Sequence, residues 1–204
     1  MLDSLYSSWN KNFWLIETKQ NSTALIKAFS KYFDYYKDNK DLLSASGDMQ
    51  KYFDKDEALD VEEYLTKLIS KKFIEHDIPL KLNGNQNYLE KDKHRSAMLG
   101  SRWMIKYQEG GWQSLHQHQK HEDENYVLIS CVMYFNAAGP KLKDGCFVAI
   151  FPEKDGTIKW EEISPTPGTI VIMSGNVVHG AYPTSTDRNI IVMDFIAEKI
   201  KNES

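Results

Sequence analysis

The sequence predicts an α+β fold, in which a jelly-roll barrel or β-sandwich is buttressed on one outer face by N-terminal helices. Helix-like spacing of apolar residues occurs within the first hundred residues, and short strand-like runs separated by turn residues follow from residue 101. A chain of 204 residues with 41% hydrophobic residues can also bury one sizeable core. We therefore expect a single domain over residues 1–204, with a mainly helical support region over 1–100 and a jelly-roll core over 101–197.

Two amphipathic helices are expected in the support region. The first covers residues 24–37 and follows three residues, 21–23, of types that favour helix N-caps. The second covers about 57–75 and carries lysines opposite its apolar stripe. Both helices should pack on an apolar surface. Their apolar positions are Leu25, Phe29, Tyr32 and Tyr36 in the first segment, and Val61, Leu65, Leu68 and Phe73 in the second.

Short strands are expected throughout the jelly-roll core. Several of the apolar runs are rich in Val and Ile with almost no polar positions, which is typical of strands covered on both faces. Cys131 and Cys146 each lie inside such a run, so they should be buried thiols and not a disulfide pair. The predicted strands are residues 101–107, 126–135, 146–151, 157–163, 168–174 and 188–197.

Charge and hydropathy narrow the possible partners and locations. The net charge is −4 with acids and bases interspersed, so neither nucleic acid nor a membrane surface is an expected partner. The N-terminus lacks the pattern of a secretory signal, and no segment approaches the roughly 18 apolar residues of a membrane span. We expect a cytoplasmic protein. The sequence leaves its oligomeric state open.

The stretch SLHQHQKHEDEN, residues 114–125, concentrates side chains that can bind a metal. His116 and His118 have the i, i+2 spacing that places two side chains on the same side of a strand, about 7 Å apart. Imidazole is a common ligand for transition metals, and His179, after the 168–174 strand, could supply a third ring. Because an isolated pair of this spacing is often a surface accident, the interpretation as a metal site depends on the residues that follow.

Arg188 opens the apolar strand 188–197, nine residues after His179. Burying an unpaired guanidinium costs roughly several kcal/mol, so an anion is expected beside it. A carboxylate that accepts two hydrogen bonds from the guanidinium is the natural partner. The alternative is an arginine at the rim that pairs with Asp187 or another surface acid. Three histidines ahead of it in the chain favour the anion-binding hypothesis.

Three segments together resemble the 2-oxoglutarate- and Fe(II)-dependent oxygenases, in particular the prolyl 4-hydroxylase-like branch. The segments are YQEGGWQSLHQH, YVLISCVMYFN and PGTIVIMSGNVVHGAYPTSTDR, within residues 101–197. The resemblance implies a double-stranded β-helix (jelly-roll) barrel as the catalytic core. It also implies Fe(II), 2-oxoglutarate and O2 as cofactor and co-substrates, and a hydroxylated product formed with succinate and carbon dioxide.

The resemblance also implies roles for individual residues. His116 would be the first metal ligand, His179 the distal histidine, and Arg188 the residue that binds the far carboxylate of 2-oxoglutarate. Tyr134 and Tyr107 would donate hydroxyl hydrogen bonds to the co-substrate, although aromatic residues in strands are also ordinary core material. Small molecules and peptides are both possible substrates, because substrate choice in this family depends on loops without a transferable motif.

One position departs from the family pattern, because His118 stands where the family has a carboxylate ligand. The metal would then be held by three histidines, by a shifted motif that begins at His121, or by His116 together with Glu122 or Asp123. We favour His116, His118 and His179, since the residues before His116 fit the family motif. A neutral ligand in place of an anionic one makes the metal site one charge more positive.

Two rival interpretations use the same architecture. A cupin-type metal dioxygenase or isomerase, without 2-oxoglutarate, fits the spacing of Gly110, His116, His118 and Glu122, but it leaves Arg188 without a role. A non-catalytic jelly-roll binding domain would hold the histidines for structural reasons only. Metal binding and 2-oxoglutarate binding distinguish these alternatives from the oxygenase.

Overall fold

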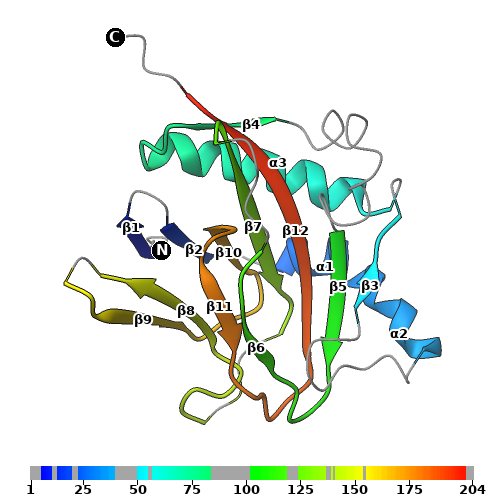
Figure 1. Ribbon diagram of the computed structural model, residues 1–204. Helices are drawn as coiled ribbons and strands as arrows, with labels where there is room; N and C mark the ends of the chain where they lie inside the picture. Colours follow the sequence, from blue (N-terminus) through cyan, green and yellow to red (C-terminus); the bar gives the residue numbers. More distant parts are fainter. Residues whose placement is uncertain are drawn as a thin grey trace.

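The computed structural model describes most of the chain and places two β-sheets face to face (Figure 1). The described residues are 6–10, 13–19, 23–39, 50–54, 57–83, 102–118, 124–136, 139, 141–153 and 155–200. In chain order the elements are β1 (Tyr6–Asn10), β2 (Phe13–Lys19), α1 (Thr23–Phe29), η1 (Ser30–Asp34, a 3-10 helix), α2 (Tyr35–Asp38), β3 (Lys51–Tyr52), α3 (Leu59–Glu75), β4 (Leu80–Asn83), β5 (Arg102–Tyr107), β6 (Gln113–His116), β7 (Tyr126–Tyr134), β8 (Phe147–Pro152), β9 (Ile158–Ile163), β10 (Thr169–Ser174), β11 (Val178–Ala181) and β12 (Arg188–Lys199).

Within the described residues, the strands form a major sheet of eight strands and a minor sheet of four. The major sheet has the order β1-β2-β10-β7-β12-β5-β3, and β4 also pairs with β12. The minor sheet has the order β6-β11-β8-β9. All of the strand pairs among these residues are antiparallel, and the chain crosses repeatedly between the sheets, as it does in a jelly roll.

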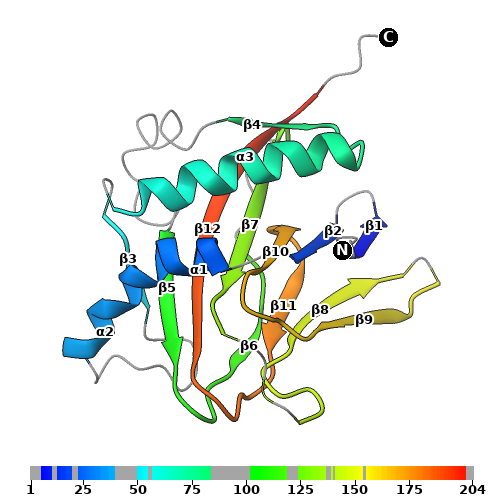
Figure 2. The same ribbon diagram turned by 180° about the vertical axis from the view of Figure 1, so that it is seen from behind.

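The major sheet is buried on both faces, which explains why its strands read as nearly continuous apolar runs. Alternate residues point to opposite faces of a strand, so Ile191 and Met193 of β12 pack toward the helices. Ile190 and Val192 of the same strand pack toward the minor sheet. Figure 2 shows α1 and α3 across the helix-facing side of the sheet. The prediction of strands covered on both faces is confirmed.

The six predicted strands are all present, with bounds that differ by one or two residues at most. The structure adds β6 and β11, which carry His116 and His179 and which the sequence analysis did not delimit. Both are only four residues long, so their sequences contain too little alternation to reveal a strand. Cys131 and Cys146 are free and buried, as expected.

The predicted helices form, but the first is interrupted. Its middle is the 3-10 helix η1, whose turns have about three residues and not 3.6. The tighter turn changes the buried face, so Phe33 is buried while Tyr32 is only partly so. Helix α3 buries the predicted stripe and also Lys72, whose ammonium lies 2.7 Å from Glu75. The lysines are therefore not all on the exposed face.

The first hundred residues also contribute strands that the sequence analysis did not predict. Strand β2 pairs with β1 on one side and with β10 on the other, inside the major sheet. Strands β3 and β4 pair with β5 and β12. The N-terminal region thus extends the same sheet that the C-terminal half builds. None of the helices in the described ranges is long and apolar enough to cross a membrane.

Candidate active site

Three histidines from two separate segments meet in a cavity lined by strands of both sheets. His116 ends β6 and lies directly opposite His179 of β11 in the antiparallel pair, with 4.3 Å between their ring centroids. His118 follows two residues later, and its backbone N–H donates to the carbonyl of Gly175 at 2.9 Å. One ring nitrogen from each histidine lies within 4.8 Å of the other two. The structure therefore brings together the three residues that the sequence analysis favoured.

The second nitrogen of each ring is engaged in a hydrogen bond that orients it. Nδ1–H of His116 donates to the Ser114 carbonyl at 2.9 Å, and Nδ1–H of His179 donates to the Val177 carbonyl, also at 2.9 Å. A carbonyl oxygen can only accept, so these two rings carry their proton on Nδ1 and leave the Nε2 lone pair for a ligand. His118 Nδ1 is 2.8 Å from the carboxylate Oδ2 of Asp194, which is also an acceptor. Three Nε2 atoms presented in this way suit a divalent transition metal.

Burial favours the neutral form of His116 and His179, which is the form that metal binding requires. It lowers the pKa of His179 well below its ordinary value, and the neighbouring His116 and His118 lower it further. Burial also lowers the pKa of His116, against the opposing effect of its hydrogen bond to Ser114. Neutral imidazoles have a free lone pair, so little proton competition opposes a metal ion at these two rings near pH 7.

Arg188 is buried with only part of its hydrogen-bonding capacity used. The residue is 2% exposed, and its Nη1 donates to the Gly145 carbonyl at 3.1 Å and to the Tyr182 carbonyl at 3.5 Å. Its Nε and Nη2 atoms have no hydrogen-bond partner among the described residues. The alternative of a rim arginine paired with Asp187 is wrong, because the guanidinium is buried and Asp187 lies 3.5 Å from Lys106 instead. Two free donors on one buried guanidinium suit a carboxylate.

The two candidate tyrosines lie at the ends of β5 and β7, the two strands that flank β12, and are both buried. The Tyr107 ring lies under the Arg188 guanidinium, 4.2 Å from its central carbon, and the Tyr107 hydroxyl donates to Gln113 Oε1 at 2.8 Å. Burial raises the pKa of Tyr134 although Arg188 opposes the shift, so this phenol stays protonated and can donate. Tyr134 is thus the better placed of the two to offer a hydroxyl.

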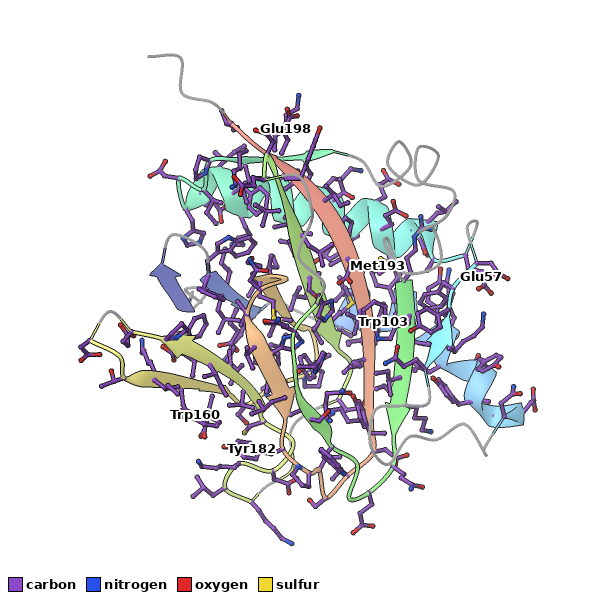
Figure 3. All side chains as sticks on the ribbon, viewed as in Figure 1. Glu57, Trp103, Trp160, Tyr182, Met193 and Glu198 are labelled. Carbon is purple, nitrogen blue, oxygen red and sulfur yellow. The ribbon has the colours of Figure 1, made fainter. Side chains whose placement is uncertain are left out.

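All six candidate residues line one cavity of about 300 Å³. Its walls also include Trp103 of β5, labelled in Figure 3, whose ring stacks on His118 with 5.8 Å between centroids. Phe147 and Val132 add apolar surface, while Gln50 and Tyr52 line a further part of the wall. The cavity therefore combines three imidazoles that could hold a metal, a buried cation and a lining of mixed apolar and polar side chains, a composition that suits a small-molecule site.

Asp194 is the site residue that the sequence analysis missed. A signal for it was present, because an acid in the middle of the apolar run IIVMDFIA must have a partner if the strand is buried. Trp112, in the segment between β5 and β6, is 43% exposed and does not line the cavity. The alternative ligands Glu122 and Asp123, and His121, lie outside the described residues.

The two sheets have the architecture of a double-stranded β-helix, with histidines from β6 and β11 and an arginine from β12 directed into its interior. No family model and no curated protein sequence matches the chain. Comparison with solved structures, in contrast, shows the same fold in proteins of low sequence identity.

Two of these structures are prolyl hydroxylases, and a third has nickel and 2-oxoglutarate bound. A prolyl-4-hydroxylase from Pseudomonas putida is 18% identical, with 91% of this chain and 92% of that chain covered and a TM-score of 0.58. A prolyl hydroxylase from Trichoplax adhaerens, in complex with a hypoxia inducible factor peptide fragment, is 14% identical over 91% of this chain and 84% of that chain, with a TM-score of 0.57. HygX from Streptomyces hygroscopicus, with nickel and 2-oxoglutarate bound, is 11% identical, with 91% of this chain and 81% of that chain covered and a TM-score of 0.51. The chain therefore has the prolyl 4-hydroxylase-like fold.

Proposed function

We propose that the protein is a 2-oxoglutarate- and Fe(II)-dependent oxygenase that hydroxylates a small-molecule or peptide substrate. The observation that carries this proposal is the presence, in one cavity, of three convergent histidines and a buried arginine with two unused donors. A metal site alone would suit many enzymes. A buried guanidinium beside it calls for an anionic ligand, and 2-oxoglutarate has a second carboxylate that can meet Arg188 while its other end lies at the metal.

The residues of the cavity would bind the metal and 2-oxoglutarate and limit the access of water to the reaction. His116, His118 and His179 would hold Fe(II) through Nε2, and the ion with 2-oxoglutarate and O2 would supply the oxidation of a substrate C–H bond, leaving succinate and carbon dioxide. Arg188 orients the co-substrate, and the Tyr134 hydroxyl can donate to it. Apolar side chains such as Phe147 and Val132 line part of the cavity and would limit the access of water to the reacting groups.

The cupin alternative is less well supported. A cupin that works without 2-oxoglutarate leaves no ligand for the two free nitrogens of Arg188, which would then remain buried without partners. A non-catalytic binding domain has no reason to direct three oriented imidazoles at one point. The similarity of the fold to a peptide-bound prolyl hydroxylase supports peptides as one class of substrate, alongside small molecules.

The test is an anaerobic titration of the protein with Fe(II) and 2-oxoglutarate. We expect a weak visible charge-transfer band that disappears in Arg188→Ala while the metal content is retained, and that is partly kept in Arg188→Lys. Lys143→Ala is the matched control, because it removes a half-exposed cation that does not line the cavity. A wild-type protein that binds Fe(II) but forms no complex with 2-oxoglutarate would contradict the proposed function.

A further inference from the structure

Asp194 is a buried acid whose side chain is directed at one of the three histidines. Its Oδ2 lies 2.8 Å from His118 Nδ1, and the side chains of Asp194 and His118 are only 7% and 8% exposed. In the part of the chain that the structure describes, His118 is the only hydrogen-bond partner of the Asp194 carboxylate. The other carboxylate oxygen, Oδ1, is buried without a hydrogen-bond partner among the described residues. The contact with His118 therefore carries most of the compensation for burying this carboxylate.

The register of β12 fixes this contact. Strand β12 pairs with β7 along its whole central part, and Asp194 lies opposite Ser130. Its neighbours Met193, labelled in Figure 3, and Phe195 pack into the core on the helix side. Alternation along the strand then directs Asp194 to the cavity side, where it lines the cavity with Val192.

We propose that Asp194 is a positioning residue that supplies, through the ring of His118, the negative charge that the family motif places directly on the metal. This inference rests on the proposed function. His116 and His179 donate to neutral backbone carbonyls, and His118 alone among the three has an anionic partner. It is also His118 that occupies the position of the missing carboxylate ligand.

The charges at the site agree with this role. Three neutral imidazoles leave a divalent ion with both of its positive charges, whereas a carboxylate ligand would neutralise one of them. A carboxylate hydrogen-bonded to Nδ1–H makes Nε2 more basic and lowers the net charge of the assembly by one. Asp194 does not have to touch the ion. Its Oδ2 accepts a hydrogen bond from Nδ1 of His118, and Nε2 on the other side of the same ring faces the other two histidines.

The experiment compares metal affinity in Asp194→Asn and in the wild type, measured with Co(II) in the absence of 2-oxoglutarate. Asparagine keeps the size of the side chain and an oxygen that can accept from Nδ1–H, so chiefly the charge is lost. We expect about a tenfold or greater increase in Kd and a shift of the Co(II) absorption bands. Glu161→Gln is the matched control, because Glu161 is also a buried acid but does not line the cavity, and its Kd should be unchanged.

A double-mutant cycle tests whether Asp194 acts through His118. In a His118→Ala background, Asp194→Asn should change the Kd no further, and a persisting loss would show instead that Asp194 binds the metal itself. Circular dichroism and thermal unfolding in EDTA establish that each variant is folded, and Asp194→Ser replaces Asp194→Asn if the latter does not fold. Wild-type protein that binds no metal overturns the proposed function as well. Wild-type and Asp194→Asn proteins with equal Kd values overturn only this inference.

Discussion

Arg188 and Asp194 lie six residues apart on β12, and both side chains line the cavity between the two sheets. At about 3.3 Å per residue their backbones are separated by roughly 20 Å, with Ile190 and Val192 between them on the same face. One strand thus carries the cation proposed for the co-substrate and the anion that contacts His118. Strands β5 and β7 pair with the two edges of β12, so both charged groups stand on a rigid support.

His118→Asp restores the ligand pattern of the family, but we expect it to weaken metal binding unless Asp194 is changed as well. The new carboxylate would lie beside the buried Asp194 carboxylate, and two like charges in such a site favour protonation over metal binding. His118→Asp with Asp194→Asn should therefore bind Co(II) at least about tenfold more tightly than His118→Asp alone. Equal Kd values, measured by the same absorption titration, would contradict the proposed coupling of the two positions.

Gly180→Ala should damage the metal site without altering a ligand. A Cβ at this position would lie 2.8 Å from the Gln113 carbonyl oxygen and 3.1 Å from that of Ser114, both on β6. Backbone cannot yield as a flexible side chain can, so β6 and β11 must move apart and carry His116 away from His179. We expect a clear loss of metal affinity and a loss of stability of about 1–3 kcal/mol.

Gly156→Ala is the control for Gly180→Ala. Gly156 has a φ of +84° and no atom within 4 Å of an added Cβ, so alanine strains the backbone without a steric clash. It should lower the melting temperature and leave the Kd for Co(II) unchanged. If both variants bind metal like the wild type, the packing of β6 against β11 does not set the distance between the histidines.

Much of the fold could be predicted because burial on two faces leaves a strong pattern in single strands. The runs that form β7 and β10 and the centre of β12 are mostly apolar, and turn residues delimit β7 and β10 to within one residue. Strand β2 could not be found in the same way. Its sequence FWLIETK carries only four apolar residues before Glu17 and Thr18, and its pairing with β10 joins segments about 150 positions apart.

The candidate site was predictable where several unusual residues occur in a fixed order along the chain, as His116, His179 and Arg188 do. The partner of His118 was not predictable in that way, because Asp194 is 76 positions away and only the register of β12 against β7 turns it toward the ring. Local propensity contains no information about such a contact. The hydrogen bond that occupies the Tyr107 hydroxyl depends in the same way on the tertiary position of Gln113.

Tyr134→Phe should weaken 2-oxoglutarate binding more than Tyr107→Phe does. Tyr134 lines the cavity and its hydroxyl is close enough to Arg188 for the guanidinium to influence its pKa. The Tyr107 hydroxyl, in contrast, already donates to Gln113, and the Tyr107 ring supports the guanidinium through a contact that phenylalanine keeps. Loss of one hydrogen bond to a carboxylate predicts an increase in Kd of about tenfold for Tyr134→Phe, with metal affinity unchanged. Calorimetric titration of the two variants measures both values, and the reverse order would assign the donor role to Tyr107.

Glu17 predicts a pH dependence of stability that is independent of the metal site. It is a buried acid on β2, its Oε1 has no hydrogen-bond partner among the described residues, and the ammonium of Lys19 is 3.5 Å away. Burial raises its pKa above the ordinary value, and Lys19 only partly opposes the shift. The ionised form is therefore disfavoured in the folded state.

Glu17→Gln should make the metal-free protein more stable than the wild type at pH 7, by an amount on the order of 1 kcal/mol. Because the pKa of Glu17 is raised, the folded state binds more protons than the unfolded state at pH values between the ordinary pKa and the pKa in the folded protein. The stability of the wild type therefore rises as the pH falls through that window. The advantage of Gln is then full above the folded pKa and shrinks as the pH decreases. Glu63→Gln is the control of opposite sign, because the exposed Glu63 has its pKa lowered by Lys67 and its loss gives no gain at pH 7. Urea unfolding in EDTA between pH 5 and 8 measures the difference, and a Glu17→Gln protein less stable than the wild type at pH 7 contradicts the assignment.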